Sequence, residues 1–105
     1  MNSIILTGRI ANTSGERMLN GRPLVTFTLI TKSKNNFDRH HIAAWDGAAR
    51  VARLFRDGDY AHIEGHIQYR DITLPSGEVV KDPQICARTL YSMKPVEDER
   101  EANGG

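Results

Sequence analysis

Residues 60–70 read YAHIEGHIQYR, and this stretch constrains the fold more than any other in the chain. From Ala61 onward, small or apolar residues alternate with polar ones, which is the period of a β-strand with one buried face. The turn signal PSG follows at residues 75–77, between two further β-like arms at residues 68–74 and 78–80. The stretch therefore predicts a long strand that continues into an extended hairpin.

Outside this stretch, four segments have the apolar runs or alternation of strands, and one has the period of a helix. Strands are predicted at residues 4–10, 24–31, 39–45 and 84–91, with polar segments at residues 12–21 and 32–38. After the third strand, Asp46 offers an N-cap, apolar residues recur at helical spacing up to Phe55, and Gly58 suits a helix end. One short helix is therefore expected before the fourth strand.

The predicted order is three strands, one helix, a long hairpin and a closing strand. This is the order of the oligonucleotide-binding (OB) fold. It is an all-β, five-stranded barrel with one short α-helix between strands three and four and an extended hairpin between strands four and five. Ligands of such barrels bind on the face of strands two and three and at the hairpin loops. We assign residues 1–94 to this domain and expect residues 95–105 to form a disordered acidic tail.

Composition limits the class of protein. The chain has 105 residues and a formal net charge of +1, but residues 1–96 carry thirteen Lys and Arg against nine Asp and Glu, a net of +4. A mildly basic domain suits a polyanionic partner. No stretch approaches the roughly 20 apolar residues of a membrane span, and the N-terminus lacks the features of a secretory signal. We therefore expect a cytoplasmic protein with no membrane partner. Because small barrels often self-associate through open strand edges, we also expect a homodimer or homotetramer.

Histidine and cysteine are not spaced for a metal site. His62 and His66 would lie roughly 13 Å apart on one strand, too far to share an ion. His40 and His41 would point to opposite faces of theirs. Cys86 stands alone in an apolar segment and is expected to be a small buried side chain. Since no nucleotide-binding or nucleophile motif appears either, neither a cofactor nor a catalytic residue is predicted.

Four pieces of the sequence resemble one known family, the bacterial single-stranded DNA-binding proteins, together with the related primosomal replication protein N. They lie at residues 4–10, 25–29, 49–58 and 62–70. The last piece, HIEGHIQYR, resembles the strand-four signature of the family. The pieces follow the family's order and spacing over about residues 3–93. The resemblance implies a non-enzymatic protein of bacterial, plasmid or phage origin. It would bind single-stranded DNA largely without sequence specificity in DNA replication, recombination or repair.

The family holds bases on aromatic side chains of strand three and the strand-four hairpin, while basic residues contact phosphates. By position in the resemblance, Trp45 falls on a stacking site and Arg70 on a basic site at the base of the hairpin. The chain departs from the family where Arg39 and Ile72 stand in positions that are tryptophan in many members. Arg39 can itself stack on a base through its planar guanidinium, so it is a candidate replacement.

Two further aromatic side chains are candidates to replace the missing stacking positions. Phe37 lies in the polar segment after the second strand, with no obvious core to join, and Tyr69 lies in the hairpin. Tyr69 alternates in phase with the apolar residues Ile63 and Ile67, so we expect it to be buried unless the hairpin twists away from the barrel. Trp45 could instead fill the core where strand three meets the helix. The remaining candidate phosphate contacts are Lys32, Lys34, Arg56 and Lys81.

The C-terminal tail gives information about protein partners and about alternative functions. Many family members recruit other replication or recombination proteins through an acidic tail with an apolar tip, and this chain has the acids but ends in Asn-Gly-Gly. A scaffold like the primosomal replication protein, acting mainly through protein contacts, therefore stays open as a second function. The altered stacking positions and the missing tip favour it. An RNA-binding barrel is a third possibility.

Overall fold

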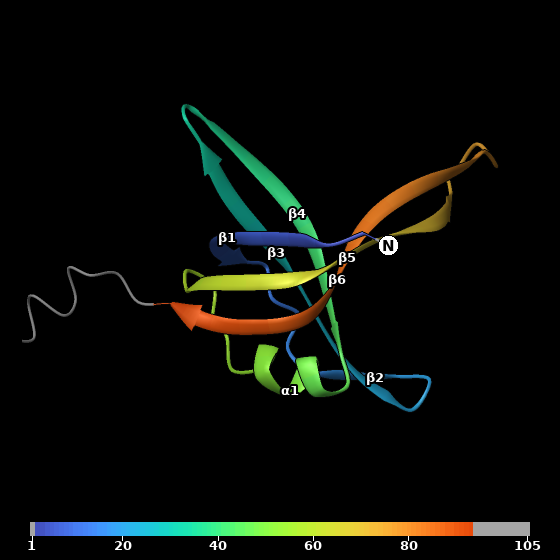
Figure 1. Cartoon of the computed structure of the whole chain (residues 1–105). Coiled ribbons are helices and arrows are strands. Elements are labelled where there is room, and N and C mark those ends of the chain that lie inside the picture. The colour runs from blue at the N-terminus through green and yellow to red at the C-terminus, as the bar shows by residue number, and fades with distance from the viewer. Residues whose placement is uncertain (1, 94–105) are drawn as a thin grey trace, which may run out of the picture.

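The computed structural model describes residues 2–93 of the chain (Figure 1). The elements are β1 (Ile4–Ala11), β2 (Arg17–Leu19), β3 (Arg22–Ser33), β4 (Asn36–Trp45), α1 (Gly47–Ala52), β5 (Tyr60–Thr73) and β6 (Val79–Met93). Apart from one short helix, the regular structure is β-strand, as the sequence predicts. The expected tail at residues 95–105 lies outside the described residues, so the domain boundary at residue 94 stays a prediction.

The barrel closes because β1 pairs with a strand on each of its sides. It pairs antiparallel with β5 from Ile4 to Arg9 and antiparallel with β3 from Arg9 to Ala11. The order β5-β6-β4-β3 completes the ring, in which β4 and β6 run parallel. β2 pairs with β3 alone and lies outside the ring. The predicted five-stranded OB barrel, with its helix between the third and fourth barrel strands β4 and β5, is confirmed.

Inward-facing side chains of the barrel strands form the core. On β3, the buried face contains Val25, Phe27 and Leu29, which is the face that its alternation predicts. The same period of two holds at the start of β5, where Ala61 and Ile63 are buried, because one side of a barrel strand faces the interior. On β4, Ile42, Ala43 and Ala44 are all buried. The largest fully buried side chains are Ile10, Val25, Leu29, Ile42 and Ile63.

α1 covers one end of the barrel and is shorter than the sequence suggested. Ala52 is fully buried, and Phe55, in the turn after the helix, packs edge-on against Phe27 with 6.1 Å between ring centroids. The helix ends at Ala52 rather than continuing to Gly58. The next two hydrogen bonds, accepted by Val51 and Ala52, span three residues instead of four. This tighter turn brings Phe55 into the core.

Two long hairpins project beyond the barrel, in addition to the short hairpin of β2 and β3 (Figure 1). We call them the β3–β4 finger (residues 31–38) and the β5–β6 finger (residues 68–84). β3 and β4 pair without interruption up to Ser33 and Asn36, and Lys34 takes a left-handed backbone, φ 51°, in the tight turn. The predicted polar loop at residues 32–38 is therefore wrong. The backbone hydrogen bonds between two strands can continue where the side chains are polar and exposed, and such a stretch has the amino-acid composition of a loop. The β5–β6 finger is confirmed.

Three smaller expectations are wrong. Asp46 occupies the N-cap position, but its side chain makes no capping bond and pairs with Arg22 instead. Cys86 is only partly buried, and its thiol donates to Gln68 Oε1 at 3.0 Å, while desolvation raises the pKa of the thiol. The polar segment at residues 12–21 contains the short strand β2. In each case, a partner on another strand determines the local structure.

Two glycines allow neighbouring strands to come close together. A side chain on Gly8 would clash with the carbonyl of Ile30, and one on Gly65 would clash with the carbonyl of Cys86. Gly8 therefore lets β1 approach β3 where the barrel closes. Gly65 lies at the irregularity where the register between β5 and β6 shifts by one residue.

The described residues also bear on membrane and metal binding. Among residues 2–93, no helix is long and apolar enough to cross a membrane. The same residues contain no group of three or more His, Cys, Asp or Glu side chains placed to hold a metal ion. His62 instead stacks on Tyr91 with 4.7 Å between ring centroids and lies 3.1 Å from Thr7 Oγ1.

We predict that Gly65→Ala destabilises the protein by about 1–3 kcal/mol, the usual cost of forcing extra atoms into a packed site. The methyl group would push against the backbone of Cys86 on β6. Gly47→Ala is the matched control, because nothing lies within 4 Å of the added atom at that position and alanine suits the start of α1. Urea unfolding followed by circular dichroism measures both variants. Equal stability of the two would contradict the prediction.

Candidate nucleic-acid interface

The outer face of β4 carries several of the side chains that the sequence singled out. Ile42 and Ala44 point into the core, so the residues that alternate with them lie on the outer face of the sheet. Five residues of this face extend over roughly 26 Å at the usual rise of a strand. We call this column the β4 track; its members are Phe37, Arg39, His41, Ala43 and Trp45, of which Ala43 is buried beneath its neighbours.

A row of side chains crosses the track at Arg39. Tyr60 on β5 lies opposite Arg9 on β1. Arg9 is in turn opposite Ile30 on β3, which lies opposite Arg39. Directly opposite residues point to the same face, and neighbouring strands lie about 4.8 Å apart, so the row spans roughly 14 Å. Closure of the barrel thus brings side chains of β1 and β5 beside the β4 track.

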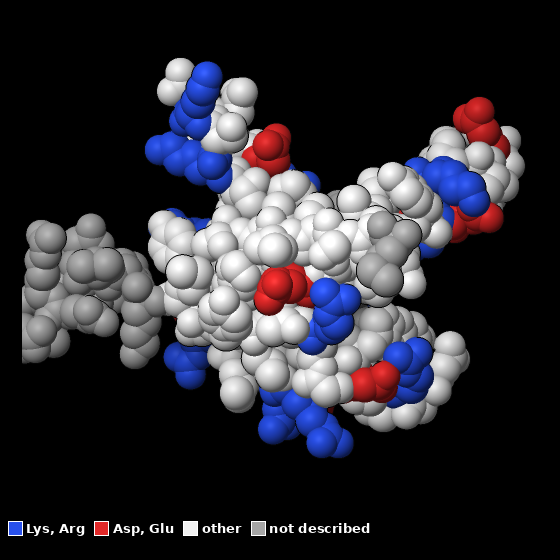
Figure 2. Space-filling model, in the orientation of Figure 1, with Lys and Arg blue, Asp and Glu red and all other residues white. Residues whose placement is uncertain are grey.

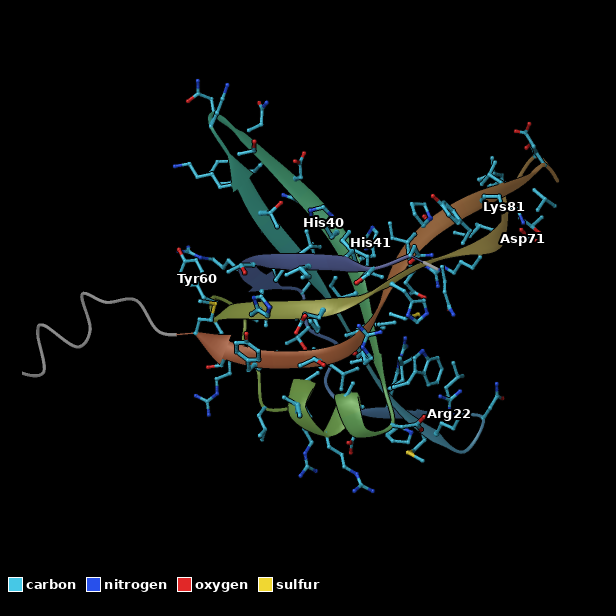
Figure 3. All side chains as sticks on the ribbon, viewed as in Figure 1. Arg22, His40, His41, Tyr60, Asp71 and Lys81 are labelled. Atoms are coloured by element: carbon cyan, nitrogen blue, oxygen red, sulfur yellow. The ribbon has the colours of Figure 1, made fainter. Side chains whose placement is uncertain are left out.

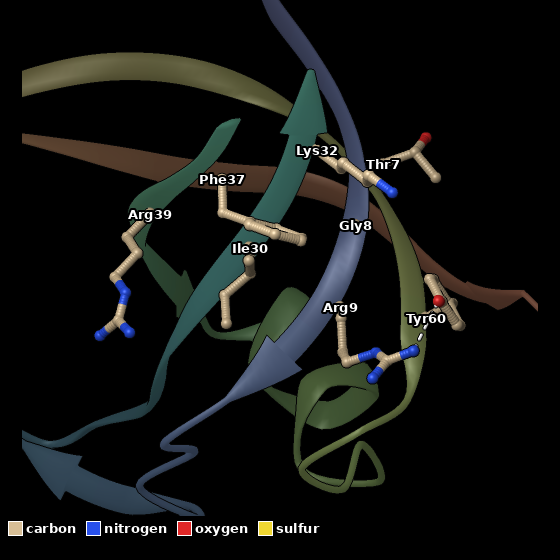
Figure 4. Close-up of a pocket in the computed structure, with 8 residues that line it drawn as sticks. All are labelled: Thr7, Gly8, Arg9, Ile30, Lys32, Phe37, Arg39 and Tyr60. Atoms are coloured by element: carbon tan, nitrogen blue, oxygen red, sulfur yellow. Dashed lines mark hydrogen bonds between the residues drawn. The ribbon is translucent and has the colours of Figure 1, made fainter. Parts of the chain in front are cut away.

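A hollow of about 660 Å³ opens where the row and the track meet, and we call it the Phe37 hollow (Figure 4). Phe37 is 67% exposed, and Lys32 Nζ lies 5.9 Å from the centre of its ring. Figure 4 shows Arg39 on one side of Ile30 and Arg9 on the other. The structure thus brings together three predicted residues, Lys32, Phe37 and Arg39. The full lining is Thr7, Gly8, Arg9, Ile30, Lys32, Phe37, Arg39 and Tyr60.

Arg9 and Tyr60 belong to this hollow, although sequence reasoning did not single them out. Arg9 Nη2 donates to the hydroxyl of Tyr60 at 2.6 Å, and its guanidinium carbon lies 4.9 Å from the centre of the ring. The available signal was a lone cation at the end of an apolar strand, Ile4–Ala11. That signal says that Arg9 is exposed, but only barrel closure says which residues it meets.

A smaller hollow of about 200 Å³ lies along the middle of the track. Arg17 of β2, His41 of β4 and Arg70 of β5 line it, together with Thr26 and Thr28 of β3. Arg70 was predicted as a phosphate contact, whereas Arg17 and His41 were not. The hollow therefore adds cationic side chains from outside β4 to the track.

The predicted cations of the β5–β6 finger have acidic neighbours. Arg70 Nε lies 3.1 Å from Asp82 Oδ2, and Lys81 Nζ lies 2.9 Å from Asp71 Oδ1 (Figure 3). In Figure 2, Lys and Arg gather at the tip of the β3–β4 finger, whereas basic and acidic side chains lie side by side on the β5–β6 finger. The positive charge of Arg70 and Lys81 is thus largely balanced within the protein.

The remaining predicted residues lie outside both hollows. Tyr69 is 64% exposed, because it lies on the part of β5 that projects from the barrel. Its position on the apolar side of the strand therefore does not lead to burial. Lys34 is exposed at the turn of the β3–β4 finger. Arg56 is exposed in the loop after α1, where its backbone N–H donates to Asp59 at 2.9 Å.

Trp45 ends the track and is not part of the core. It is partly exposed, and the guanidinium carbon of Arg22 lies 4.7 Å from the centre of its ring. Arg22 also binds Asp46, with 2.6 Å between Nη2 and Oδ2, and this hydrogen bond holds the pKa of the Asp46 carboxyl below its usual range. Trp45 therefore keeps the accessibility that a stacking role requires.

Exposed aromatic rings and cations thus recur along one outer face of the barrel. Every base has a flat π-face that can stack on an aromatic ring or on a guanidinium, and cations neutralise phosphates whatever the base. The arrangement suits a nucleic-acid strand held by its faces and its backbone.

Comparison with known proteins agrees with this geometry. The model of the Single-strand binding protein family matches residues 1–93, which include the whole barrel and both hollows. Among curated proteins, no sequence matches the chain significantly. Proteins of the matched family bind single-stranded DNA and are not enzymes. The chain belongs to the single-strand binding protein family.

Proposed function

We propose that this protein binds single-stranded DNA, largely without sequence specificity, on the β4 track and in the Phe37 hollow. The observation that carries the proposal is the hollow itself, where an exposed Phe37 stands among the cations Arg9, Lys32 and Arg39. Membership of the single-strand binding protein family supports the choice of ligand. The expected setting is DNA replication, recombination or repair in the cytoplasm.

The proposed mechanism combines stacking with phosphate neutralisation. One base stacks on Phe37, and Lys32, Arg39 and Arg9 contact the neighbouring phosphates. Each stacked base contributes about 1–3 kcal/mol, and each neutralised phosphate releases condensed counterions. Neither term depends on the identity of the base, which explains why such a site tolerates any sequence.

The strand would run from the Phe37 hollow along the track to Trp45. At about 3.4 Å per nucleotide, the roughly 26 Å of the track would hold about eight nucleotides, and fewer if the strand is extended. This lies within the roughly 4–16 nucleotides that OB folds bind. Arg17 and Arg70 would contact phosphates midway, with the contribution of Arg70 reduced by its ion pair with Asp82.

We predict that Phe37→Ala weakens binding of oligo-dT by about 1–3 kcal/mol, the contribution of one stacked base. The fold should be retained, because the side chain is 67% exposed. Leu54→Ala is the control, since Leu54 is 71% exposed and does not line either hollow. Fluorescence anisotropy of labelled oligo-dT measures both affinities. The stacking role of Phe37 is rejected if the two variants bind equally well.

We predict that Lys32→Gln lowers the steepness of the salt dependence, and that Lys81→Gln changes it less. Each phosphate contact on a single strand contributes about 0.7 to the slope of log K against log salt. Lys32 lies in the hollow, whereas Lys81 is paired with Asp71 at 2.9 Å. Titrations between about 50 and 200 mM salt give the slopes. A larger loss for Lys81→Gln would move the interface to the β5–β6 finger.

The alternative of a protein-contact scaffold is favoured by the β5–β6 finger. Its cations are balanced by acids, and its aromatic Tyr69 is 64% exposed. A scaffold does not need the Phe37 hollow. If the wild-type protein leaves oligo-dT unbound at low salt, DNA binding is rejected as its main activity, and the scaffold function and RNA binding are the remaining candidates.

We also propose that the protein self-associates as a homodimer or homotetramer. From Ile4 to Gly8, β1 pairs with β5 on one side, and its pairing with β3 on the other side begins only at Arg9. A second copy can pair with such an open edge. Ile5 is 60% exposed beside this edge, which supports an apolar contact there.

We predict that Ile5→Lys reduces the sedimenting mass of the protein to that of a monomer. A lysine on the outer face of β1 would place a charge in the proposed contact between copies. Leu54→Lys adds the same charge to an exposed side chain after α1 and should leave the association intact. Sedimentation velocity compares the two variants with the wild type. A monomeric wild type would contradict the proposal.

A further inference from the structure

Arg22, Trp45 and Asp46 form a cluster at the end of the β4 track opposite the Phe37 hollow (Figure 3 labels Arg22). Arg22 Nη2 donates to Asp46 Oδ2 at 2.6 Å, and Nε lies 3.2 Å from both carboxylate oxygens. The guanidinium carbon lies 4.7 Å from the centre of the Trp45 ring. One guanidinium thus meets a carboxylate with its edge and an indole with its face.

The backbone takes up an unfavourable conformation at this cluster. Asp46 has φ 55° and ψ −119°, a region that residues with side chains rarely adopt. Its carboxylate also makes no bond to the first turn of α1, although aspartate is among the best N-caps. The ion pair gained in exchange leaves 55% of each side chain exposed, and exposed pairs contribute little to stability. Stability alone therefore does not account for the cluster.

One edge of the Arg22 guanidinium is available to a ligand. Asp46 binds the edge formed by Nε and Nη2. Nη1 and the second hydrogen of Nη2 have no hydrogen-bond partner among residues 2–93. A planar guanidinium edge matches two oxygens of a phosphate. The carboxylate also limits the rotation of the side chain, so this free edge is already oriented.

Arg22 covers only one side of the Trp45 indole, and the other side faces along the β4 track. Trp45 lies opposite Leu24 in the register of β3 and β4. Arg22 is two residues before Leu24, whereas Thr26, which lines the smaller hollow, is two residues after it. The guanidinium therefore covers the indole from the terminal side. A base that arrives along the track meets the indole from the other side.

We propose that Arg22 binds a phosphate of the same DNA strand at the Trp45 end of the track, and that Asp46 is a positioning residue that holds the guanidinium on the indole. The proposal rests on the proposed function. It adds a phosphate contact that the Phe37 hollow does not contain, and it assigns a role to an acid inside a DNA-binding surface.

The first test compares Arg22→Ala with Arg50→Ala in the full chain. Both variants remove one exposed arginine, but Arg50 lies on α1 and does not line either hollow. We expect Arg22→Ala to weaken oligo-dT binding about tenfold and to lower the salt slope by about 0.7, with less change for Arg50→Ala. Quenching of Trp45, the one tryptophan of the chain, should also change for Arg22→Ala. Equal affinities and slopes for the two variants would overturn the proposal.

The second test separates positioning by Asp46 from competition by Asp46. Asp46→Asn removes a negative charge, so a carboxylate that merely competes with phosphate predicts tighter binding and a steeper slope. A positioning residue predicts binding about threefold weaker. Arg22→Lys keeps the charge but not the planar fork, and should retain the slope while losing part of the affinity. Tighter binding by Asp46→Asn would overturn the role of Asp46.

The two proposals fail in different ways. If wild-type protein does not bind oligo-dT, the proposed function itself is rejected. If the wild type binds and Lys32→Gln weakens it, but Arg22→Ala does not, the Phe37 hollow stands and the role of Arg22 is rejected. Thermal unfolding of each variant identifies any loss of affinity that comes from misfolding.

Discussion

The rest of the structure depends on one strand, β1, pairing on both of its sides. Arg9 takes part in both pairings, with Tyr60 on β5 and with Ile30 on β3. The close approach requires Gly8, since a side chain there would clash with the carbonyl of Ile30. Without this closure, two strands would separate β5 from β3 in the sheet order. Tyr60 could not then share a hollow with Phe37.

Cross-strand neighbours decide which cations of the barrel can meet a ligand. Lys32 lies opposite Phe37, so its charge stays available beside an exposed ring. Lys81 lies opposite Asp71, which binds it at 2.9 Å. The two lysines look alike in the sequence, and both lie on projecting hairpins. The charge of Lys32 therefore lies beside an aromatic ring, whereas that of Lys81 is paired with a carboxylate. Figure 2 shows basic side chains gathered at the tip of the β3–β4 finger and mixed with acidic ones on the β5–β6 finger.

The two ends of the β4 track hold their aromatic rings differently. Phe37 is 67% exposed on a projecting finger, whereas Trp45 is partly covered by a guanidinium that a carboxylate holds in place. A stacking surface that is fixed in advance loses less entropy on binding than a mobile one. In the proposed interface, Trp45 would therefore be the stacking position that is oriented before binding, and Phe37 the more open one.

The sequence by itself determined the barrel strands, their buried faces and the family, because these depend on a period of two and on short motifs that act locally. It also identified Lys32, Phe37 and Arg39, which share a hollow on adjacent strands. It missed the strand pairing through residues 32–38, the place of Arg9 and Tyr60 in the Phe37 hollow, and the ion pairs of the β5–β6 finger. The pairing through residues 32–38 is local, but its exposed polar side chains show no apolar alternation. The ion pairs of the β5–β6 finger depend on which residues the register places opposite each other. Only the tertiary structure decided that Arg9 and Tyr60 line the hollow, because barrel closure joins residues about fifty positions apart, and the sequence does not show which of them become neighbours.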